Sequence, residues 1–211
     1  MIVLGLDTCL AACSCAVVED GRVLARAAEP MARGHQERLA PLVQETMAAA
    51  GLGFAALARI GVTVGPGSFT GLRVGLAFAK GLGEALGIPV VGVGALEALA
   101  AAEPRGLTFA AIDARRGQVY LQAFRDGTPL MAPDALAIET AAARLAEFHT
   151  GEPVALVGSG GPLLAGVLPG ARLVAAEGCD PKAVARIAAS RAPTPARPLY
   201  LRAPDARLPQ A

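Results

Sequence analysis

The sequence predicts an α/β protein of two related lobes with a cleft between them, and three observations lead to this prediction. Apolar segments of strand periodicity alternate with segments of helical periodicity. The second half of the chain repeats the order of elements of the first half. A glycine-rich turn, VGPGS in the first half and VGSGG in the second, follows an apolar strand in each copy. Each lobe is therefore expected to have the order β-β-β-α-β-α.

The first lobe is expected to span residues 1–104 and to begin with three strands. Apolar alternation predicts them near residues 2–7, 12–18 and 22–28, with EDGR turning between the last two. A helix then carries apolar residues at helical spacing and ends near Gly51. The pattern continues with a strand at 60–64, a helix at about 68–86 and a strand at 88–93.

The second lobe, expected at residues 105–211, repeats these signals. TFAAIDA corresponds to IVLGLDT, QVYLQAF to CSCAVVE, and RDGTPL to EDGRVL. Asp113 precedes its Asp-Gly turn by the interval that separates Asp7 from the Asp-Gly turn of the first lobe. A helical stretch, the strand VALVG, the second glycine turn and a strand at 172–176 follow. Two matched motifs in the same order indicate a duplicated fold.

A last helix and a tail complete the second lobe. Asp180 is expected to be the N-cap of this helix and Pro181 its first residue, since proline needs no hydrogen bond to its nitrogen there. The tail, APTPARPLYLRAPDARLP, is proline-rich and is predicted to be extended.

Composition narrows the class of protein. Hydrophobic residues make up 54% of the 211 residues and charged residues 18%, which predicts a substantial core. The net charge of +1 gives no electrostatic signature of nucleic-acid binding by this chain alone. No apolar run reaches the ~18 residues of a membrane-spanning helix, and MIVLGLD lacks the basic segment of a signal peptide. We therefore expect a cytoplasmic protein without membrane contact and with reduced cysteines.

The aspartates that end the first strand of each lobe are candidates for ligand binding. Open α/β sheets bind ligands at the carboxyl ends of their strands, and paired carboxylates suit metal-phosphate coordination. The duplicated lobes resemble actin-like ATPases (the ASKHA class, with ribonuclease H-like lobes). However, DTCLAAC lacks a glycine for close approach to phosphate, so the aspartates could instead cap local turns. The candidate nucleotide-binding residues are Asp7, Thr8, Gly65, Gly67 and Asp113.

Other residues with reactive side chains have structural interpretations beside functional ones. Ser68 follows the glycine turn, but the G-x-S-x-G spacing of hydrolases is not met, so a helix N-cap is expected. His35 has Leu39 at i+4 and therefore no second metal ligand on its helix. The cysteines of CLAACSC have no fourth ligand at a zinc-like spacing. No metal site is predicted.

Glycines recur along the helix that follows the first glycine turn. Gly71 and Gly75 continue a row of small residues at every fourth position. Glycine costs about 1 kcal/mol relative to alanine inside a helix, so close packing must compensate. The packing partner could be the helix near 35–50, the sheet beneath, or another subunit.

Six segments give a resemblance to a known family: GLDTCLAACSCAV, RGHQERLAPLV, VTVGPGSFTGLRVGLAFAKGL, IPVVGV, DARRGQVY and PLYLR. They are similar to TsaB (YeaZ) proteins, subunits of the machinery for tRNA threonylcarbamoyladenosine, over nearly the whole chain. The resemblance implies an actin-like fold and a non-catalytic subunit that supports the related catalytic subunit TsaD. The metal-binding His-x-x-x-His of TsaD-like proteins is replaced here by Ala95 and Leu99.

The resemblance also implies partners. They are a TsaD-like subunit, a TsaE-like ATPase and, in their absence, a second copy of this chain. The product would be threonylcarbamoyladenosine at position 37 of ANN-decoding tRNAs, with tRNA bound only through the complex. No tightly bound cofactor is expected, and any ATP or ADP would sit at a subunit boundary. The expected interface residues are His35, Leu39, Leu42, Val43, Gly71, Gly75 and Ala79.

Two alternative functions remain open at this point. Asp7, Asp113 and the two glycine turns would also suit a stand-alone ATP-dependent kinase for a small molecule. A hydrolase with Ser68 as its nucleophile is the other alternative.

Overall fold

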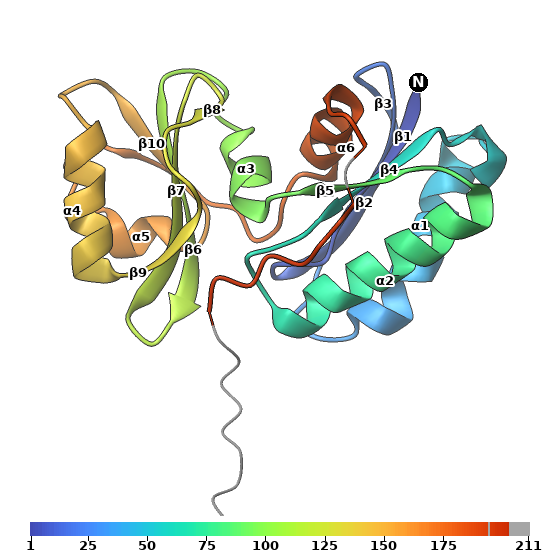
Figure 1. The fold of residues 1–211 in the computed structure, drawn as a ribbon, viewed down its shortest axis with the longest axis horizontal. Helices are drawn as coiled ribbons and strands as arrows, with labels where there is room; N and C mark the ends of the chain where they lie inside the picture. Colours follow the sequence, from blue (N-terminus) through green and yellow to red (C-terminus); the bar gives the residue numbers. More distant parts are fainter. Residues whose placement is uncertain (194, 203–211) are drawn as a thin grey trace, which may run out of the picture.

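A computed structural model describes residues 1–193 and 195–202, and it contains two lobes, each built on one sheet (Figure 1). The first sheet has five strands in the order β3-β2-β1-β4-β5. Its strands are β1 (Ile2–Asp7), β2 (Ala12–Glu19), β3 (Arg22–Pro30), β4 (Arg59–Thr63) and β5 (Val90–Val93). The β1–β2–β3 meander is antiparallel, whereas β1, β4 and β5 run parallel.

The second sheet repeats this topology in the order β11-β10-β6-β7-β8, and β9 also pairs with β7. Its strands are β6 (Leu107–Arg115), β7 (Gln118–Arg125), β8 (Thr128–Pro129), β9 (Asp134–Ala137), β10 (Val154–Val157) and β11 (Arg172–Val174). The strands β6, β10 and β11 are parallel, as β1, β4 and β5 are in the first sheet. The predicted fold class, a duplicated actin-like α/β fold, is confirmed.

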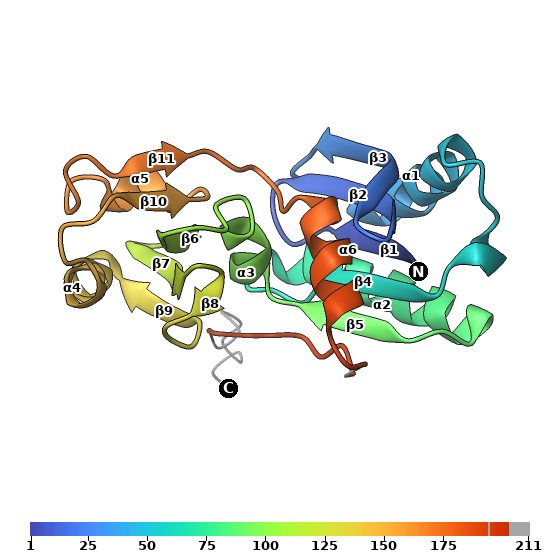
Figure 2. The ribbon, with the colours of Figure 1, turned by 90° about the horizontal axis from the view of Figure 1, so that it is seen from above.

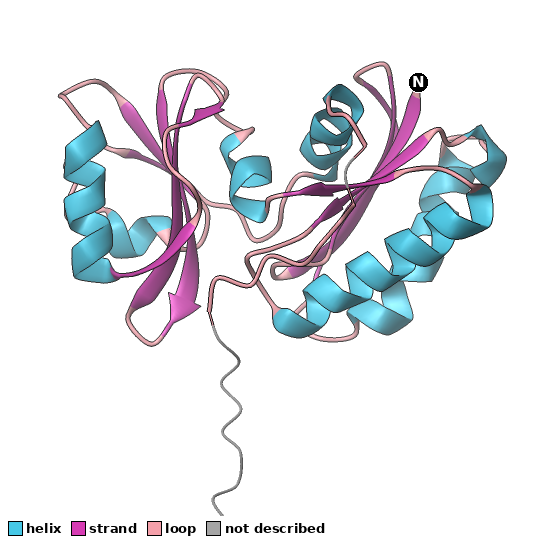
Figure 3. Cartoon of the chain, in the orientation of Figure 1, coloured by secondary structure: helices cyan, strands magenta, loops and turns pink. Residues whose placement is uncertain are grey.

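Helices cover both sheets (Figure 3). The longest, α1 (His35–Ala49) and α2 (Phe69–Leu86), lie side by side on one face of the first sheet. A short 3-10 helix, η1 (Phe54–Ala56), connects α1 to β4. On the second sheet, α4 (Ile138–Phe148) and the four-residue α5 (Gly161–Leu164) share the outer face. Within the described residues, no helix is both long and apolar enough to cross a membrane.

Each lobe is completed by a helix that follows the last strand of the other lobe. The helix α3 (Ala95–Ala100) comes after β5 but packs on β6 and β7 of the second sheet. The helix α6 (Pro181–Ser190) comes after β11 but packs on β1, β2 and β4 of the first sheet (Figure 2). The predicted boundary between lobes 1–104 and 105–211 falls between the two sheets, whereas α3 and α6 each pack on the sheet on the other side of that boundary. The amphipathic pattern of a helix shows that it has an apolar face, not which sheet covers it.

Two glycines in central strands explain the close contact between α6 and the first sheet. A Cβ atom on Gly5 of β1 would lie 2.1 Å from the carbonyl oxygen of Pro181. A Cβ atom on Gly61 of β4 would lie 2.6 Å from the Cβ of Ala188. The helix begins as predicted, since the Asp180 side chain accepts a hydrogen bond from Lys182 N–H at 3.0 Å and Pro181 is its first residue.

The chain after α6 returns along the first lobe. Pro195 forms an isolated bridge with Val91 of β5, and Leu199 N–H donates to the Val64 carbonyl oxygen at 2.7 Å. This extended path agrees with the prediction for the proline-rich tail as far as Arg202. Thr194 and residues 203–211 of the predicted tail lie outside the described residues.

Candidate functional site

The first glycine turn connects β4 to α2 and packs against the loop after β1. Ser68 N–H donates to the Cys9 carbonyl oxygen at 2.7 Å, so a peptide carbonyl of this chain lies at the start of the helix. The Ser68 hydroxyl oxygen accepts a hydrogen bond from Gly71 N–H at 3.2 Å. Ser68 is therefore the N-cap of α2, as predicted.

The glycine row of α2 packs against the same loop. A Cβ atom on Gly67 would lie 2.2 Å from the Cys9 carbonyl oxygen, and one on Gly71 would lie 2.0 Å from the Thr8 carbonyl oxygen. A Cβ atom on Gly75 would lie 2.4 Å from the Thr8 hydroxyl. The row therefore packs on the β1–β2 loop of the same lobe and also on the sheet beneath, where a Cβ atom on Gly75 would lie 3.5 Å from Cγ2 of Val62 in β4. The sheet is one of the three partners that the sequence allows. The glycines give α2 room to lie directly on that loop.

Thr8 is enclosed by this contact. Its hydroxyl donates to the Gly71 carbonyl oxygen at 2.7 Å, and only 1% of the residue is exposed. Gly65 is also buried, and its carbonyl oxygen accepts from Ala95 N–H at 2.8 Å. The polar groups of both residues are hydrogen-bonded inside the protein, and their contact with a nucleotide stays a prediction.

Asp7 is fully buried, and the surrounding backbone uses both of its carboxylate oxygens. Oδ1 accepts hydrogen bonds from the Thr63 hydroxyl at 2.7 Å and from Cys9 N–H at 3.0 Å. Oδ2 accepts from Cys179 N–H at 2.8 Å. Cys179 lies on the segment that returns from the second lobe to α6. Asp7 therefore joins three segments of chain, and its contact with a nucleotide stays a prediction.

Burial also changes the ionisation of Asp7. Loss of hydration raises the pKa of its carboxyl above the usual range, although the hydrogen bonds from Thr63, Cys9 and Cys179 oppose the shift. The thiol pKa values of Cys9 and Cys179, which lie beside this carboxylate, are raised mainly by burial as well. This neighbourhood favours neutral side chains over a charged ligand.

Asp113 occupies the equivalent position in the second lobe and faces the solvent more openly. Its Oδ1 accepts from Arg115 N–H at 2.7 Å, its Oδ2 lies 3.1 Å from the Arg115 guanidinium, and its side chain is 26% exposed. Its own N–H donates to the Ser159 hydroxyl at 3.1 Å, within the second glycine turn. Asp113 caps a local turn, yet it can still reach a ligand, so its nucleotide contact stays a prediction.

A cleft of about 790 Å³ lies between the lobes where the two glycine turns approach each other. Gly67 and Ser68 line it from the first lobe, and Asp113 and Ser159 line it from the second. Its lining also includes a second acidic residue, Glu177. Arg115 supplies a positive charge to the lining of the cleft, and it forms an ion pair with Asp113. A polyphosphate would therefore meet more negative than positive charge here.

His35 lines the same cleft at the first residue of α1. It is 8% exposed, and its buried Nε2 has no hydrogen-bond partner among the described residues. The charge interaction with His35 lowers the pKa of Asp7. It is the smallest of the contributions to the pKa of that carboxyl. His35 is thus largely buried at the edge of the cleft, and its role as an interface residue stays a prediction.

All seven predicted interface residues are buried within this chain. Leu39, Leu42 and Val43 are at most 1% exposed, Ala79 is fully buried, and Gly71 and Gly75 contact Thr8. Regularly spaced apolar and small residues mark the face of a helix that meets its own sheet, so these side chains face inward and their contact with a partner stays a prediction. The outer face of α2 instead presents partly or fully exposed residues: Val74, Ala77, Phe78, Gly81 and Ala85.

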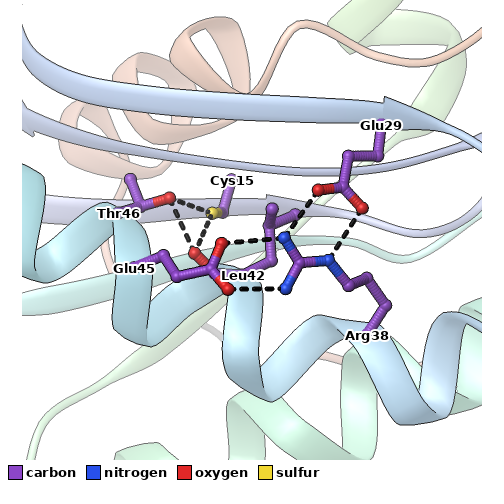
Figure 4. Close-up of polar contacts among 6 residues, drawn as sticks. All are labelled: Cys15, Glu29, Arg38, Leu42, Glu45 and Thr46. Atoms are coloured by element: carbon purple, nitrogen blue, oxygen red, sulfur yellow. Dashed lines mark hydrogen bonds and ion pairs between the residues drawn. The ribbon is translucent and has the colours of Figure 1, made fainter.

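Polar contacts fix α1 on the first sheet (Figure 4). Arg38 binds Glu29 of β3 through two nitrogens, at 2.8 and 2.6 Å, and Glu45 of α1 through two more bonds of 2.7 Å. Thr46 donates to the Leu42 carbonyl oxygen at 2.7 Å and contacts the Cys15 thiol at 3.1 Å. Bidentate geometry makes Arg38 a directional link between helix and strand.

The cysteines and the helix α3 do not contribute to a cluster of metal-ligating side chains in the described part of the chain. All four cysteines are buried free thiols, and burial raises the pKa of Cys13 to about 12. Ala95 and Leu99, whose side chains have no donor atom for a metal, are buried on α3. Within the described residues, no group of three or more metal-ligating side chains comes together.

Comparisons with known proteins agree with this fold. Residues 27–161 match the family model for TsaD: tRNA N6-adenosine threonylcarbamoyltransferase. An uncharacterized protein of Mycobacterium tuberculosis is 37% identical over 97% of this chain and 93% of its own length. The tRNA threonylcarbamoyladenosine biosynthesis protein TsaB of Escherichia coli is 40% identical over 57% of this chain and 53% of its own length. The structure of YeaZ from Pseudomonas aeruginosa superposes with a TM-score of 0.76 at 29% identity, covering 95% of this chain and 99% of that one.

The two sheets, the paired glycine turns and the exchanged helices define a two-lobed protein of the actin-like ATPase fold. Within that class, the sequence identities to TsaB proteins and the superposition on YeaZ identify the family of this chain. The chain belongs to the TsaB (YeaZ) family.

Proposed function

We propose that this chain is a non-catalytic scaffold subunit in the formation of N6-threonylcarbamoyladenosine at position 37 of ANN-decoding tRNAs. In this role it binds and supports a TsaD-like catalytic subunit. Family membership supports the pathway, and the closed first-lobe turn supports the non-catalytic role. Asp7 and Thr8, which lie where a ligand would contact the strand ends, form hydrogen bonds only within the protein.

The outer face of α2 is the proposed contact surface for the TsaD-like subunit. Apolar and small residues continue along it for three turns, partly or fully exposed, from Val74 through Ala77 and Gly81 to Ala85. A Cβ atom on Gly81 would meet nothing within 4 Å, so a partner helix can approach closely there. We propose that a second copy of this chain uses the same face when the TsaD-like subunit is absent.

Reconstitution tests the scaffold role. The purified chain should transfer no threonylcarbamoyl group from threonylcarbamoyl-AMP to tRNA, and addition of TsaD-like and TsaE-like partners from the same organism should restore transfer. Robust transfer by the isolated chain would contradict the proposal. Mass spectrometry of the digested tRNA measures the modified nucleoside directly.

A variant on α2 tests the contact surface. Gly81→Glu should leave the fold intact, because the site is open, but should bring charge into the interface and abolish co-purification with the TsaD-like subunit. The matched control is Ala146→Glu on the exposed face of α4, which should co-purify normally. Equal co-purification of both variants would exclude this face. Size-exclusion chromatography of each variant alone tests the homodimer.

A stand-alone kinase is not favoured. Its ATP and magnesium would need the Asp7 carboxylate, whose two oxygens already accept three hydrogen bonds. We instead propose that any ATP or ADP binds at a boundary with a partner, beside Asp113. Calorimetry of the isolated chain with ATP and magnesium should show no micromolar binding. Micromolar binding of ATP that is lost in Asp113→Ala would support the kinase. Asp7→Ala is a poor test, because it leaves three buried hydrogen-bond donors unpaired and so destabilises the fold.

A further inference from the structure

Two segments that lie far apart in sequence meet at the start of α2. The Arg73 guanidinium lies over the Phe69 ring, 3.6 Å from its centroid, and Arg73 Nε donates to the Tyr200 hydroxyl at 3.2 Å. The Phe69 and Tyr200 rings lie 5.4 Å apart and are inclined by 36°. The segments SFTGLR and PLYLR thus combine in one cluster, which we call the aromatic–arginine cluster (Phe69, Arg73 and Tyr200).

The path of the chain holds Tyr200 in place. Leu199 N–H bonds to the Val64 carbonyl oxygen beside the glycine turn, and Arg202 donates to the Ala114 carbonyl oxygen of the second lobe. Figure 1 shows this C-terminal segment, in red, running from the first lobe toward the space between the lobes. The cluster therefore lies beside the mouth of the cleft, whose lining includes Ser68 and Arg115.

Both rings of the cluster are unusually exposed. Phe69 is 45% exposed and Tyr200 is 46% exposed, although each is held by contacts with Arg73. Rings that are already fixed lose little conformational freedom when a flat partner stacks on them. Aromatic side chains and the guanidinium plane are the surfaces on which unstacked bases of RNA pack.

The charge of the cluster favours an anionic partner. Within the part of the chain that the structure describes, no carboxylate lies within ion-pair distance of Arg73. A base with its phosphate matches both the rings and this charge, whereas a purely apolar protein surface would leave Arg73 without a counter-charge.

We propose that the aromatic–arginine cluster is a contact site for single-stranded RNA, in which one base stacks on the cluster and Arg73 neutralises a phosphate. The inference rests on the proposed function, since the RNA would be a loop of the tRNA bound by the assembled complex. A duplex region does not fit, because its bases are stacked on each other and cannot reach the rings.

The test measures RNA binding by the assembled complex, using fluorescence anisotropy with a labelled tRNA anticodon stem-loop. Tyr200→Ala and Arg73→Ala should each weaken binding at least about fivefold, the range seen when a stacking side chain is removed. Tyr200→Phe should keep binding within about twofold, because the ring remains. The control Arg144→Ala removes an exposed arginine of α4 that pairs with Glu147 and should leave binding unchanged.

Three results would overturn the proposal. The first is unchanged affinity in Tyr200→Ala and Arg73→Ala, and the second is an equal loss in Arg144→Ala, which would indicate non-specific charge. The third is loss of complex assembly in the cluster variants, judged by size-exclusion chromatography, which would assign the cluster to a protein contact. Intact assembly with weakened RNA binding supports the site.

Two further arms separate this inference from the proposed function. In the first, binding of AMP is measured in Tyr200→Ala and Arg73→Ala. If these variants lose AMP binding but keep their affinity for the stem-loop RNA, the cluster binds a free nucleotide and the RNA proposal is overturned. If no complex forms with the TsaD-like subunit, the proposed function fails, and the isolated chain is tested with the same stem-loop at low salt. Loss of that binding in Tyr200→Ala would still support the site, and its persistence would overturn it.

Discussion

The two lobes contain the same strand-end motif in a closed and an open form. In both, an aspartate accepts a hydrogen bond from the N–H two residues on, Cys9 for Asp7 and Arg115 for Asp113. In both lobes, the glycine turn also donates a backbone hydrogen bond. Ser68 N–H donates to the Cys9 carbonyl oxygen at 2.7 Å, and Gly160 N–H donates to the Ala111 carbonyl oxygen at 2.9 Å. Yet Asp7 is fully buried, whereas the Asp113 side chain is 26% exposed.

The difference follows from the helix after each turn. In the first lobe, α2 has 18 residues, and its glycines let Thr8 and Cys9 lie directly against it. In the second lobe, α5 has four residues and covers much less of the strand ends. A duplicated motif therefore need not retain one function, because the packing around each copy decides whether its carboxylate is a structural link or remains accessible.

The largest effect is expected from filling the contact between α2 and the first-lobe loop. Gly71→Ala would place a Cβ atom 2.0 Å from the Thr8 carbonyl oxygen, and a backbone atom cannot move aside cheaply. We expect a loss of about 3 kcal/mol in the free energy of unfolding, measured by urea denaturation.

A glycine on the outer face of the same helix is the matched control. Gly81→Ala meets nothing within 4 Å and should raise the free energy of unfolding by about 0.5–1 kcal/mol, because alanine is the better helix former. A similar response to both substitutions would show that α2 does not pack on the loop in solution.

The next effect concerns the two aspartates. Asp7→Asn replaces one accepting oxygen by an NH2 group, which cannot accept a hydrogen bond. In one orientation this group faces Cys179 N–H, and in the other it faces Cys9 N–H and the Thr63 hydroxyl. We expect a loss of about 2–3 kcal/mol in the free energy of unfolding. Asp113→Asn should cost less than about 1 kcal/mol, because its side chain reaches water. Equal costs in urea denaturation would contradict the contrast between closed and open motifs.

The buried aspartate should also give stability a pH dependence. Burial raises the folded-state pKa of Asp7 above its unfolded value, so the folded chain binds the proton first as pH falls. Relative to Asp7→Asn, the wild-type chain should gain stability as pH falls through the raised pKa toward about 4, and the difference should level off below that. A difference that shrinks over this range would show that the hydrogen bonds to Asp7 outweigh its burial.

Much of this comparison could be predicted from sequence, because it rests on local patterns. Periodicity placed the long helices and most strands to within a few residues, and the caps at Ser68 and Asp180 follow from residue type. The repeat of strand, aspartate and glycine turn correctly indicated duplication. The short α3 after β5, by contrast, has too few residues for periodicity to reveal it.

What the sequence did not predict is which partner each surface meets. The i, i+4 row of Gly71 and Gly75 shows that something approaches closely, but the partner is Thr8, more than 60 residues away in sequence, which no local pattern connects to it. Likewise, Phe69 and Tyr200 come together only because the tail crosses the start of α2. Such contacts depend on the tertiary fold.

The smallest effect is expected in the open lobe, where ionisation is set by exposed hydrogen bonds rather than burial. The Thr150 hydroxyl and N–H, with Arg125, lower the pKa of Glu152 to about 2, with the Thr150 hydroxyl as the main cause. Thr150→Val should return this pKa toward its usual value near 4.5, measured by NMR titration of the carboxyl carbon. A lowered carboxyl pKa stabilises the folded state above about pH 4.5, and this contribution disappears as pH falls toward 2. The free energy of unfolding of the variant should therefore differ least from that of the wild type at acid pH. Denaturation near neutral pH should change only slightly, since solvent screens an exposed ion pair. A large loss there would show that the second lobe depends on its exposed charges as strongly as the first lobe depends on Asp7.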